Sequence, residues 1–264
     1  MDTSSREELL ISPNGEEMRG HIGALAELAV LVSLVAAGPT AAADIFSDDF
    51  SSFSSTTTWT VLNRSSPVGT TTWQQGAINS GLTAMGGGSA FAAVGYESAG
   101  AGGNATASNW LVSPAMTLEN GQSLTFDAIG QDGQGFPDRL QVRLNITNAG
   151  SDVGTTAVSV GDFGRLLLDI NPTYQSAPNP LAFPTSWTHY ALPISGLSGP
   201  VQGRFAFRYF VEDTGPDGSR GTEIAIDNVR LTAVPEPGMV AVIIPSILGL
   251  LGRFRSSTRP GGSK

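Results

Sequence analysis

The 264-residue chain contains no cysteine, only two histidines and a single lysine, Lys264. Without thiols it can form neither disulfides nor zinc–thiolate sites, and it has no cysteine nucleophile. A secreted domain of more than about 150 residues can bury enough apolar surface to fold without disulfides, so the lack of cysteine does not argue against export.

Positive charge is scarce in the middle of the chain as well. Between Asp44 and Ala233, sixteen acidic residues face eight arginines and no lysine, which gives this body a formal net charge of −8 (16 minus 8). Such a surface repels phosphate backbones, so the composition argues against nucleic acid as a partner and makes divalent cations plausible ones.

Long apolar runs are confined to the two ends of the chain. Near the start, residues 22–37 form an apolar stretch interrupted only by Glu27 and Ser33; it follows Arg19 and His21 and precedes Ala41-Ala42-Ala43. This order predicts a secretory signal helix with cleavage before Asp44, so residues 1–43 form a leader and signal peptide. The acidic segment 1–17 is atypical of such signals, which suggests a true translation start at Met18.

The second apolar run, residues 239–251, lies near the C-terminus. Its thirteen residues would span only about 20 Å as a helix, less than the ~30 Å hydrocarbon core of a bilayer. Val234-Pro235-Glu236-Pro237 precedes the run, and basic residues that include Arg253 and Arg255 follow it. Basic residues favour the cytoplasmic side, so the body would lie outside the membrane.

This arrangement in residues 234–264 resembles the PEP-CTERM sorting signal of Gram-negative bacteria. The resemblance implies recognition by a membrane-embedded exosortase through Val234, Pro235, Glu236, Pro237 and the basic end with Arg253 and Arg255. It also implies a transient stop in the inner membrane before the body reaches the cell surface or the extracellular space. An ordinary C-terminal membrane anchor behind a proline-containing linker stays open as the alternative.

Residues 44–233 are expected to form one domain rich in strands. Apolar and polar residues alternate with a period of two in segments 123–128, 139–146 and 205–211, as in half-buried strands. Turn-rich stretches separate these segments, and no long helical period occurs. The pattern predicts an all-β, two-sheet sandwich.

Several segments of the body, taken in order, resemble the choice-of-anchor J domain, which is similar to cleaved-adhesin and MAM-type jelly rolls. The resemblance implies a two-sheet jelly roll and does not imply an enzyme. The segments that carry it are Asp48-Asp49-Phe50, Trp59-Thr60-Val61, Thr72-Trp73, residues 109–114 (NWLVSP), residues 137–142 (PDRLQV), Trp187 with Tyr190 and Leu192, residues 205–209 (FAFRY) and residues 224–229 (IAIDNV).

The apolar positions of the last strand change phase at Asp227-Asn228, because Val229 and Leu231 continue the series of Ile224 and Ile226 shifted by one residue. Such a shift predicts a β-bulge, which re-aims side chains.

Related jelly rolls often hold a structural calcium between an early acidic segment and an acidic pair of the final strand. The resemblance therefore implies a calcium site at Asp48, Asp49, Asp227 and Asn228, where Asn228 stands in place of the family's usual second aspartate. Carboxylates and carbonyls are the ligands that Ca²⁺ prefers. Solvent-exposed turn caps are the alternative role for these residues.

Two further residues are candidates for ligand binding or catalysis. Trp73 has the most polar neighbours of the four tryptophans and is the best candidate for an exposed platform that stacks on sugars, although core packing is the more common role of tryptophan. His189, the one histidine of the body, could belong to a hydrolytic triad assembled in space. No Gly-x-Ser-x-Gly motif surrounds any serine, so an ordinary strand histidine is favoured.

The sequence thus predicts an exported, exosortase-processed surface or extracellular-matrix protein whose β-sandwich serves in adhesion or binding without catalysis. Extracellular polysaccharide and surface proteins are the expected partners. A carbohydrate-binding module for exopolysaccharide and a secreted hydrolase are the alternatives.

Overall fold

The computed structural model describes residues 42–53, 59–78, 81–87, 89–131 and 135–233, which all belong to one compact unit. Strands dominate this part of the chain, with a single turn of 3-10 helix. The elements are β1 (Asp44–Asp48), β2 (Thr60–Asn63), β3 (Gln74–Gln75), β4 (Ala92–Gly95), η1 (Tyr96–Ser98), β5 (Ala105–Val112), β6 (Met116–Leu118), β7 (Ser123–Gly130), β8 (Leu140–Asn145), β9 (Arg165–Ile170), β10 (Thr188–Pro193), β11 (Val201–Thr214) and β12 (Glu223–Thr232).

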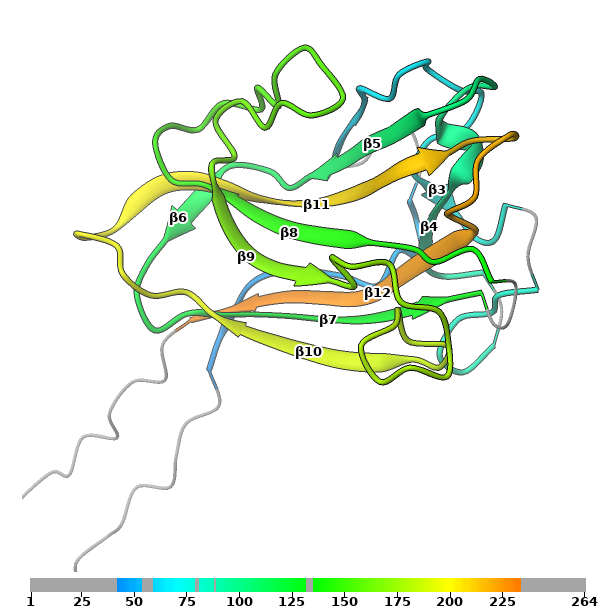
Figure 1. The fold of residues 1–264 in the computed structure, drawn as a ribbon. Coiled ribbons are helices and arrows are strands. Elements are labelled where there is room, and N and C mark those ends of the chain that lie inside the picture. The colour runs from blue at the N-terminus through cyan, green and yellow to red at the C-terminus, as the bar shows by residue number, and fades with distance from the viewer. Residues whose placement is uncertain (1–41, 54–58, 79–80, 88, 132–134, 234–264) are drawn as a thin grey trace, which may run out of the picture. The chain divides into compact units, whose positions relative to one another are not determined.

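The strands form two antiparallel sheets (Figure 1). Sheet A has the order β10-β7-β12-β4-β3, with β1 also paired to β12. Sheet B has the order β2-β5-β11-β8-β9, with β6 also paired to β11. The predicted all-β, two-sheet sandwich is therefore confirmed.

The core lies between the inner faces of the two sheets. Leu124, Phe126 and Ala128 of β7 point inward from sheet A, and Phe205 and Phe207 of β11 point inward from sheet B, all fully buried. The rings of Phe126 and Phe207 meet edge to face with centroids 5.0 Å apart. The period of two in the sequence corresponds to this inward set, as strand geometry requires.

The predicted bulge in the last strand is confirmed. The pairing of β12 with β7 shifts register between Asp227 and Arg230, and Asn228 adopts a positive φ of 51°. The other edge of β12 changes partner at the same place, from β4 along residues 223–226 to β1 along residues 229–232. The bulge therefore divides β12 into two halves with different neighbours.

Residues 146–164 form no regular element and lie over the outer face of sheet B, above β11 and β5 in Figure 1. Val153 and Phe163 pack there against Trp110 of β5. Three arginines of β8 and β11, and Arg64 directly after β2, donate hydrogen bonds to backbone carbonyls of this segment. The pairs are Arg64 to Gly154, Arg143 to Phe163, Arg204 to Ala149 and Arg208 to Ala157. We name residues 146–164 the covering segment.

Arg208 is the most deeply buried of these arginines. Its guanidinium lies 4.8 Å from the ring centroid of Trp110 and 4.0 Å from that of Phe210, so cation–π contacts replace part of the lost hydration. Ser108 and Gln141 accept further hydrogen bonds from it. Burial, with help from the nearby Arg143 and Arg139 charges, lowers the pKa of Arg208 to about 9.

The predicted signal helix (residues 1–43) and short C-terminal transmembrane helix lie outside the described residues, apart from the last two residues of the leader. Within the described part, no helix has the length and apolar character needed to cross a bilayer.

The Arg208→Ala substitution is expected to lower the free energy of unfolding by about 3 kcal/mol or more. It leaves the buried carbonyl of Ala157 without its donor, removes one of the two donors to Ser108 and to Gln141, and opens a cavity between Trp110 and Phe210. The unpaired carbonyl and the cavity are both costly. Urea denaturation of the full-length protein measures the loss.

Arg230→Ala is the matched control for this prediction. Arg230 pairs with Asp44 across 3.2 Å, but both side chains are exposed, so its loss should cost less than about 1 kcal/mol. Equal losses for the two variants would contradict the role assigned to Arg208.

Candidate functional site

The early acidic pair predicted to bind calcium lies at the end of β1 and the turn after it. Oδ1 of Asp48 accepts a hydrogen bond from the backbone N–H of Phe50 (2.7 Å), and Oδ2 accepts one from Nε1 of Trp59 (2.7 Å). Asp49 is exposed, and hydrogen bonds from Ser51 lower the pKa of its carboxyl group. Asp48 thus ties β1 to Trp59 of the core.

Asp227 and Asn228 lie at the bulge of β12, beside this turn. The Asp227 carboxyl is buried and accepts a hydrogen bond from the N–H of Asn228 (2.7 Å). Burial chiefly, and the negative charges of Asp127 and Asp49 in addition, raise the pKa of Asp227 to about 6, although backbone N–H groups partly oppose this. A carboxyl group that titrates near neutral pH needs such an environment.

Asp127 of β7 is a member of this cluster that the sequence analysis did not single out. It faces Asp227 across the sheet and is buried. Nδ2 of Asn228 donates to its Oδ2 (2.9 Å), and Nδ1 of His189 lies 2.9 Å from its Oδ1. Its position on the polar side of an alternating strand suggested a solvent-exposed residue, and only the tertiary pairing of β7 with β12 brings it to Asp227.

The four residues predicted to bind calcium are neighbours but do not form one coordination shell. A surface hollow of about 260 Å³ is lined by Asp48, Asp49 and Asn228, together with the basic Arg230. Within the described residues, no three or more His, Cys, Asp or Glu side chains are placed to hold one metal ion. Both oxygens of Asp48 already accept hydrogen bonds. The residues as placed therefore do not fit a formed calcium site, and calcium binding stays a prediction.

The His189–Asp127 contact has the geometry of a carboxylate that orients an imidazole. The His189 side chain is 62% exposed on β10. Among the described residues, no hydrogen bond joins its ring to a serine or threonine hydroxyl. The hydrolase alternative therefore gains no nucleophile from this pair.

The prediction that Trp73 is an exposed platform is wrong. Trp73 is only 2% exposed and belongs to the core between the sheets. Its Nε1 donates to the backbone carbonyl of Asn109 (3.1 Å), and the neighbouring Thr72 donates to the Asn109 side chain (3.0 Å). The polar neighbours that suggested exposure are thus bound to β5. Trp59 and Trp110 are buried too.

The sorting-signal residues Val234, Pro235, Glu236, Pro237, Arg253 and Arg255 lie outside the described residues. Their predicted role remains a prediction.

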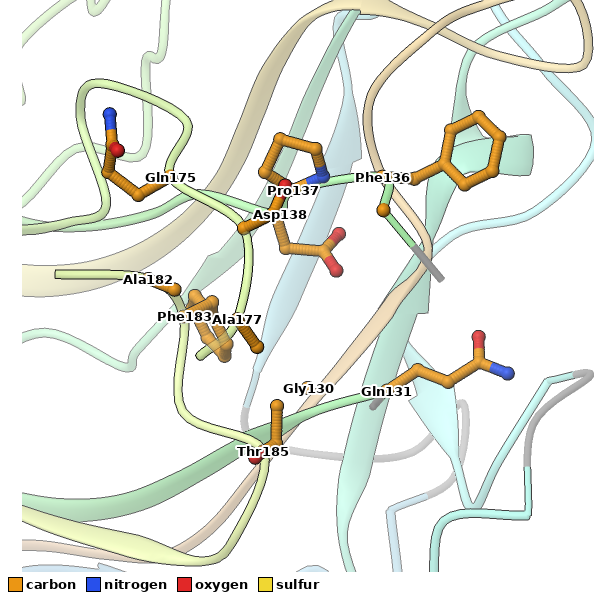
Figure 2. Close-up of a pocket in the computed structure, with 12 residues that line it drawn as sticks. Gly130, Gln131, Phe136, Pro137, Asp138, Gln175, Ala177, Ala182, Phe183 and Thr185 are labelled. Carbon is orange, nitrogen blue, oxygen red and sulfur yellow. The ribbon is translucent and has the colours of Figure 1, made fainter. Parts of the chain in front are cut away.

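A groove at one end of the sandwich was not predicted. It consists of two adjoining hollows, of about 150 and 290 Å³, which share the side chains of Gln131 and Phe136. The described residues that line it come from four parts of the chain: Tyr96, residues 130–131 and 135–138, residues 175–177, 182, 183 and 185, and residues 215, 216, 218, 221 and 222. In Figure 2, Ala177, Ala182 and Phe183 lie on one side of the first hollow and Gln131 and Phe136 on the other. Apart from Tyr96, these residues fall in or next to turn-rich stretches of the sequence, and no motif there indicates a binding site.

Asp138 fixes the floor of this groove. Its carboxyl group accepts hydrogen bonds from the hydroxyl of Tyr209 (2.7 Å), the N–H of Thr222 (2.9 Å) and the Thr222 hydroxyl. Complete burial raises the pKa of Asp138, an effect that these hydrogen bonds partly offset. Because Asp138 precedes β8, Tyr209 lies in β11 and Thr222 precedes β12, one carboxyl joins both sheets at this end.

Comparison with known proteins gives structural similarity only. No protein-family model matches the sequence, and no curated protein matches it. The K1 cleaved adhesin domain of Lys-gingipain from Porphyromonas gingivalis is 20% identical, with 71% of this chain and 97% of that domain covered and a TM-score of 0.47. The K3 domain of the same protein is 17% identical, with 73% of this chain and 99% of that domain covered and a TM-score of 0.47. The C-terminal family 22 carbohydrate-binding module of a Clostridium thermocellum protein is 15% identical, with 74% of this chain and 98% of that module covered and a TM-score of 0.41.

Asp227→Asn is expected to raise the melting temperature at pH 7.5 in the presence of a chelator by about 2–4 °C, the shift that roughly 1 kcal/mol produces in a domain of this size. A carboxyl whose pKa is raised to about 6 on folding destabilises the fold increasingly as the pH rises from about 4 to above 6. Asparagine keeps the acceptor oxygen and removes the charge. The difference should vanish near pH 4, as measured by differential scanning calorimetry.

Calcium supplies the second part of this experiment. If the predicted site forms on binding, added Ca²⁺ should raise the melting temperature of the wild-type protein at pH 7.5 and should raise that of Asp227→Asn much less. Asp162→Asn, on the covering segment, is the control and should respond like the wild type. An identical melting curve with Ca²⁺ and with chelator would rule out the calcium prediction.

Proposed function

We propose that this chain is an exported protein whose β-sandwich, a choice-of-anchor J-like jelly roll, acts in adhesion or binding at the cell surface or in the extracellular matrix. An exosortase-type enzyme processes its C-terminal segment after a transient stop in the inner membrane. The domain recognises its partner with the end groove and carries out no catalysis.

The observation that carries this proposal is the position of the groove relative to the end of the domain. Thr222 lines the groove, and β12 runs from there to Thr232, about 30 Å away at the rise of an extended strand. Ala233 then donates a backbone hydrogen bond to Ala43 (2.8 Å). The segments that carry the proposed signals therefore join the domain at the end opposite the groove (Figure 1). A domain held at that end presents the groove outward.

The outer faces of the two sheets are partly covered, which favours the groove as the binding site. The covering segment closes much of sheet B. On sheet A, Leu82 and Ala84 pack over Phe91, Ala93 and Ala225. Concave sites are the usual places for ligands, and the connections at the groove end provide one that neither layer covers.

The proposed processing predicts a change in mass. Protein recovered from cells that contain the exosortase is expected to lack residues after the Pro235–Pro237 region, whereas cells without the enzyme should retain the full tail. Intact-mass spectrometry of the full-length gene product measures this difference. An uncut tail in both strains would reduce residues 234–264 to a plain anchor.

The proposed binding role predicts that Phe136→Ala weakens attachment of producing cells to a layer of the same cells at least several-fold. Phe136 is 46% exposed and lines both hollows of the groove, so its loss removes contact area without unfolding the domain. Leu166→Ala is the matched control, because Leu166 is 44% exposed but lies on β9, outside the groove. Equal attachment of both variants and the wild type, at equal surface amounts, would refute the role of the groove.

A further inference from the structure

The groove around Phe136 is acidic. Among the described residues that line its two hollows, there is no arginine, lysine or histidine. Asp138 forms the floor of one hollow, and Glu97 and Glu223 line a smaller recess that adjoins the other at Tyr96 and Thr222. A carboxylate, sulfate or phosphate group on a ligand would meet these carboxyl groups and, among the described lining residues, no basic side chain to pair with. The charge pattern thus selects against anionic ligands.

Phe136 provides an apolar platform in this polar setting. It is one of few large apolar side chains of the described residues that are exposed, whereas Phe183 across the hollow is buried. An exposed aromatic ring at the mouth of a hollow offers a flat apolar face, which suits the C–H face of a sugar ring. The position of Phe136 between the two hollows leaves room for a ring on either side of it.

A side-chain amide and a phenolic hydroxyl with hydrogen-bonding capacity to spare lie beside this ring. The backbone N–H of Gln131 donates to the carbonyl of Glu223 (3.0 Å), which fixes the residue in place. Its side-chain amide is partly exposed and has no hydrogen-bond partner among the described residues. The hydroxyl of Tyr96, in the second hollow, makes only a long contact of 3.5 Å with Glu97. An amide and a hydroxyl of this kind can both donate to and accept from a ligand hydroxyl.

We propose that the groove binds an uncharged saccharide, with a sugar ring stacked on Phe136 and its hydroxyl groups bound by the amide of Gln131 and the hydroxyl of Tyr96. This inference rests on the proposed binding role and names the chemical class of the ligand. The aromatic face supplies affinity, and the amide of Gln131 and the hydroxyl of Tyr96 fix the orientation of the ring. The carboxyl groups exclude sugars that carry acidic groups.

The test uses the full-length protein in detergent on an array of neutral and acidic oligosaccharides, the latter bearing uronic acid or sulfate. Neutral glycans are expected to bind and acidic ones to fail. In titration calorimetry with a neutral glycan from the array, Phe136→Ala and Gln131→Ala should each weaken binding at least tenfold. Phe136→Trp should retain it, and Leu166→Ala should bind like the wild type. Unchanged melting temperatures show that the variants are folded.

Three outcomes would overturn this inference: binding of acidic glycans only, no glycan binding at all, or neutral-glycan binding that Phe136→Ala leaves unchanged. A negative result on the glycan array and a negative result in the attachment assay are independent of each other. If Phe136→Ala abolishes cell attachment while no neutral glycan binds, the groove acts on a different class of partner and only the saccharide assignment is wrong.

Discussion

Guanidinium groups bound to backbone carbonyls hold the outer layer of this domain in place. A stretch of nineteen residues without regular structure, 146–164, has few backbone partners of its own and would be costly to order alone. Donors to it come from Arg143 of β8, from Arg204 and Arg208 of β11, and from Arg64 directly after β2. Arginine suits this task because its planar fork stays charged and stacks on aromatic rings, as Arg208 does between Trp110 and Phe210.

This use of arginine also determines the charge of the exterior. The other four arginines of the body have partners as well: Arg139 binds Asp169, Arg165 binds the carbonyl of Ser195, Arg220 stacks on Tyr174 and Arg230 pairs with Asp44. With no lysine between Asp44 and Ala233, few positive charges remain to balance the acidic residues. The deficit of basic residues in the sequence is thus sharper at the groove, where the described lining residues include none. The arginines that hold the outer layer in place are therefore not available at the groove, where they could have paired with an anionic ligand.

The sequence was informative wherever local periodicity decides the structure. Alternation identified β7, β8 and β11, and the phase change at Asp227-Asn228 located the bulge, because a slip of one residue must be absorbed at one point in the chain. Features that depend on contacts between distant segments could not be predicted. Trp73 has polar sequence neighbours, yet its environment is set by Asn109, 36 residues away. Asp127 lies on a nominally polar face, yet it becomes buried opposite Asp227. The groove arises from four connections that are each unremarkable as turns and meet only in the folded domain.

β12 links the parts of the domain that matter most for the proposed role. Its first half pairs with β4 beside the groove, its second half pairs with β1 beside the chain ends, and β7 flanks both halves. The carboxyl cluster of Asp127 and Asp227 lies at the junction between these halves. A force between a ligand in the groove and a tether after Ala233 would act along this strand. Because β12 is paired on both edges, a force along its axis loads many hydrogen bonds at once, so they must break together rather than one at a time. The bulge interrupts the ladder between β12 and β7, so the charge state of Asp227 acts at a point where pairing along the strand is broken.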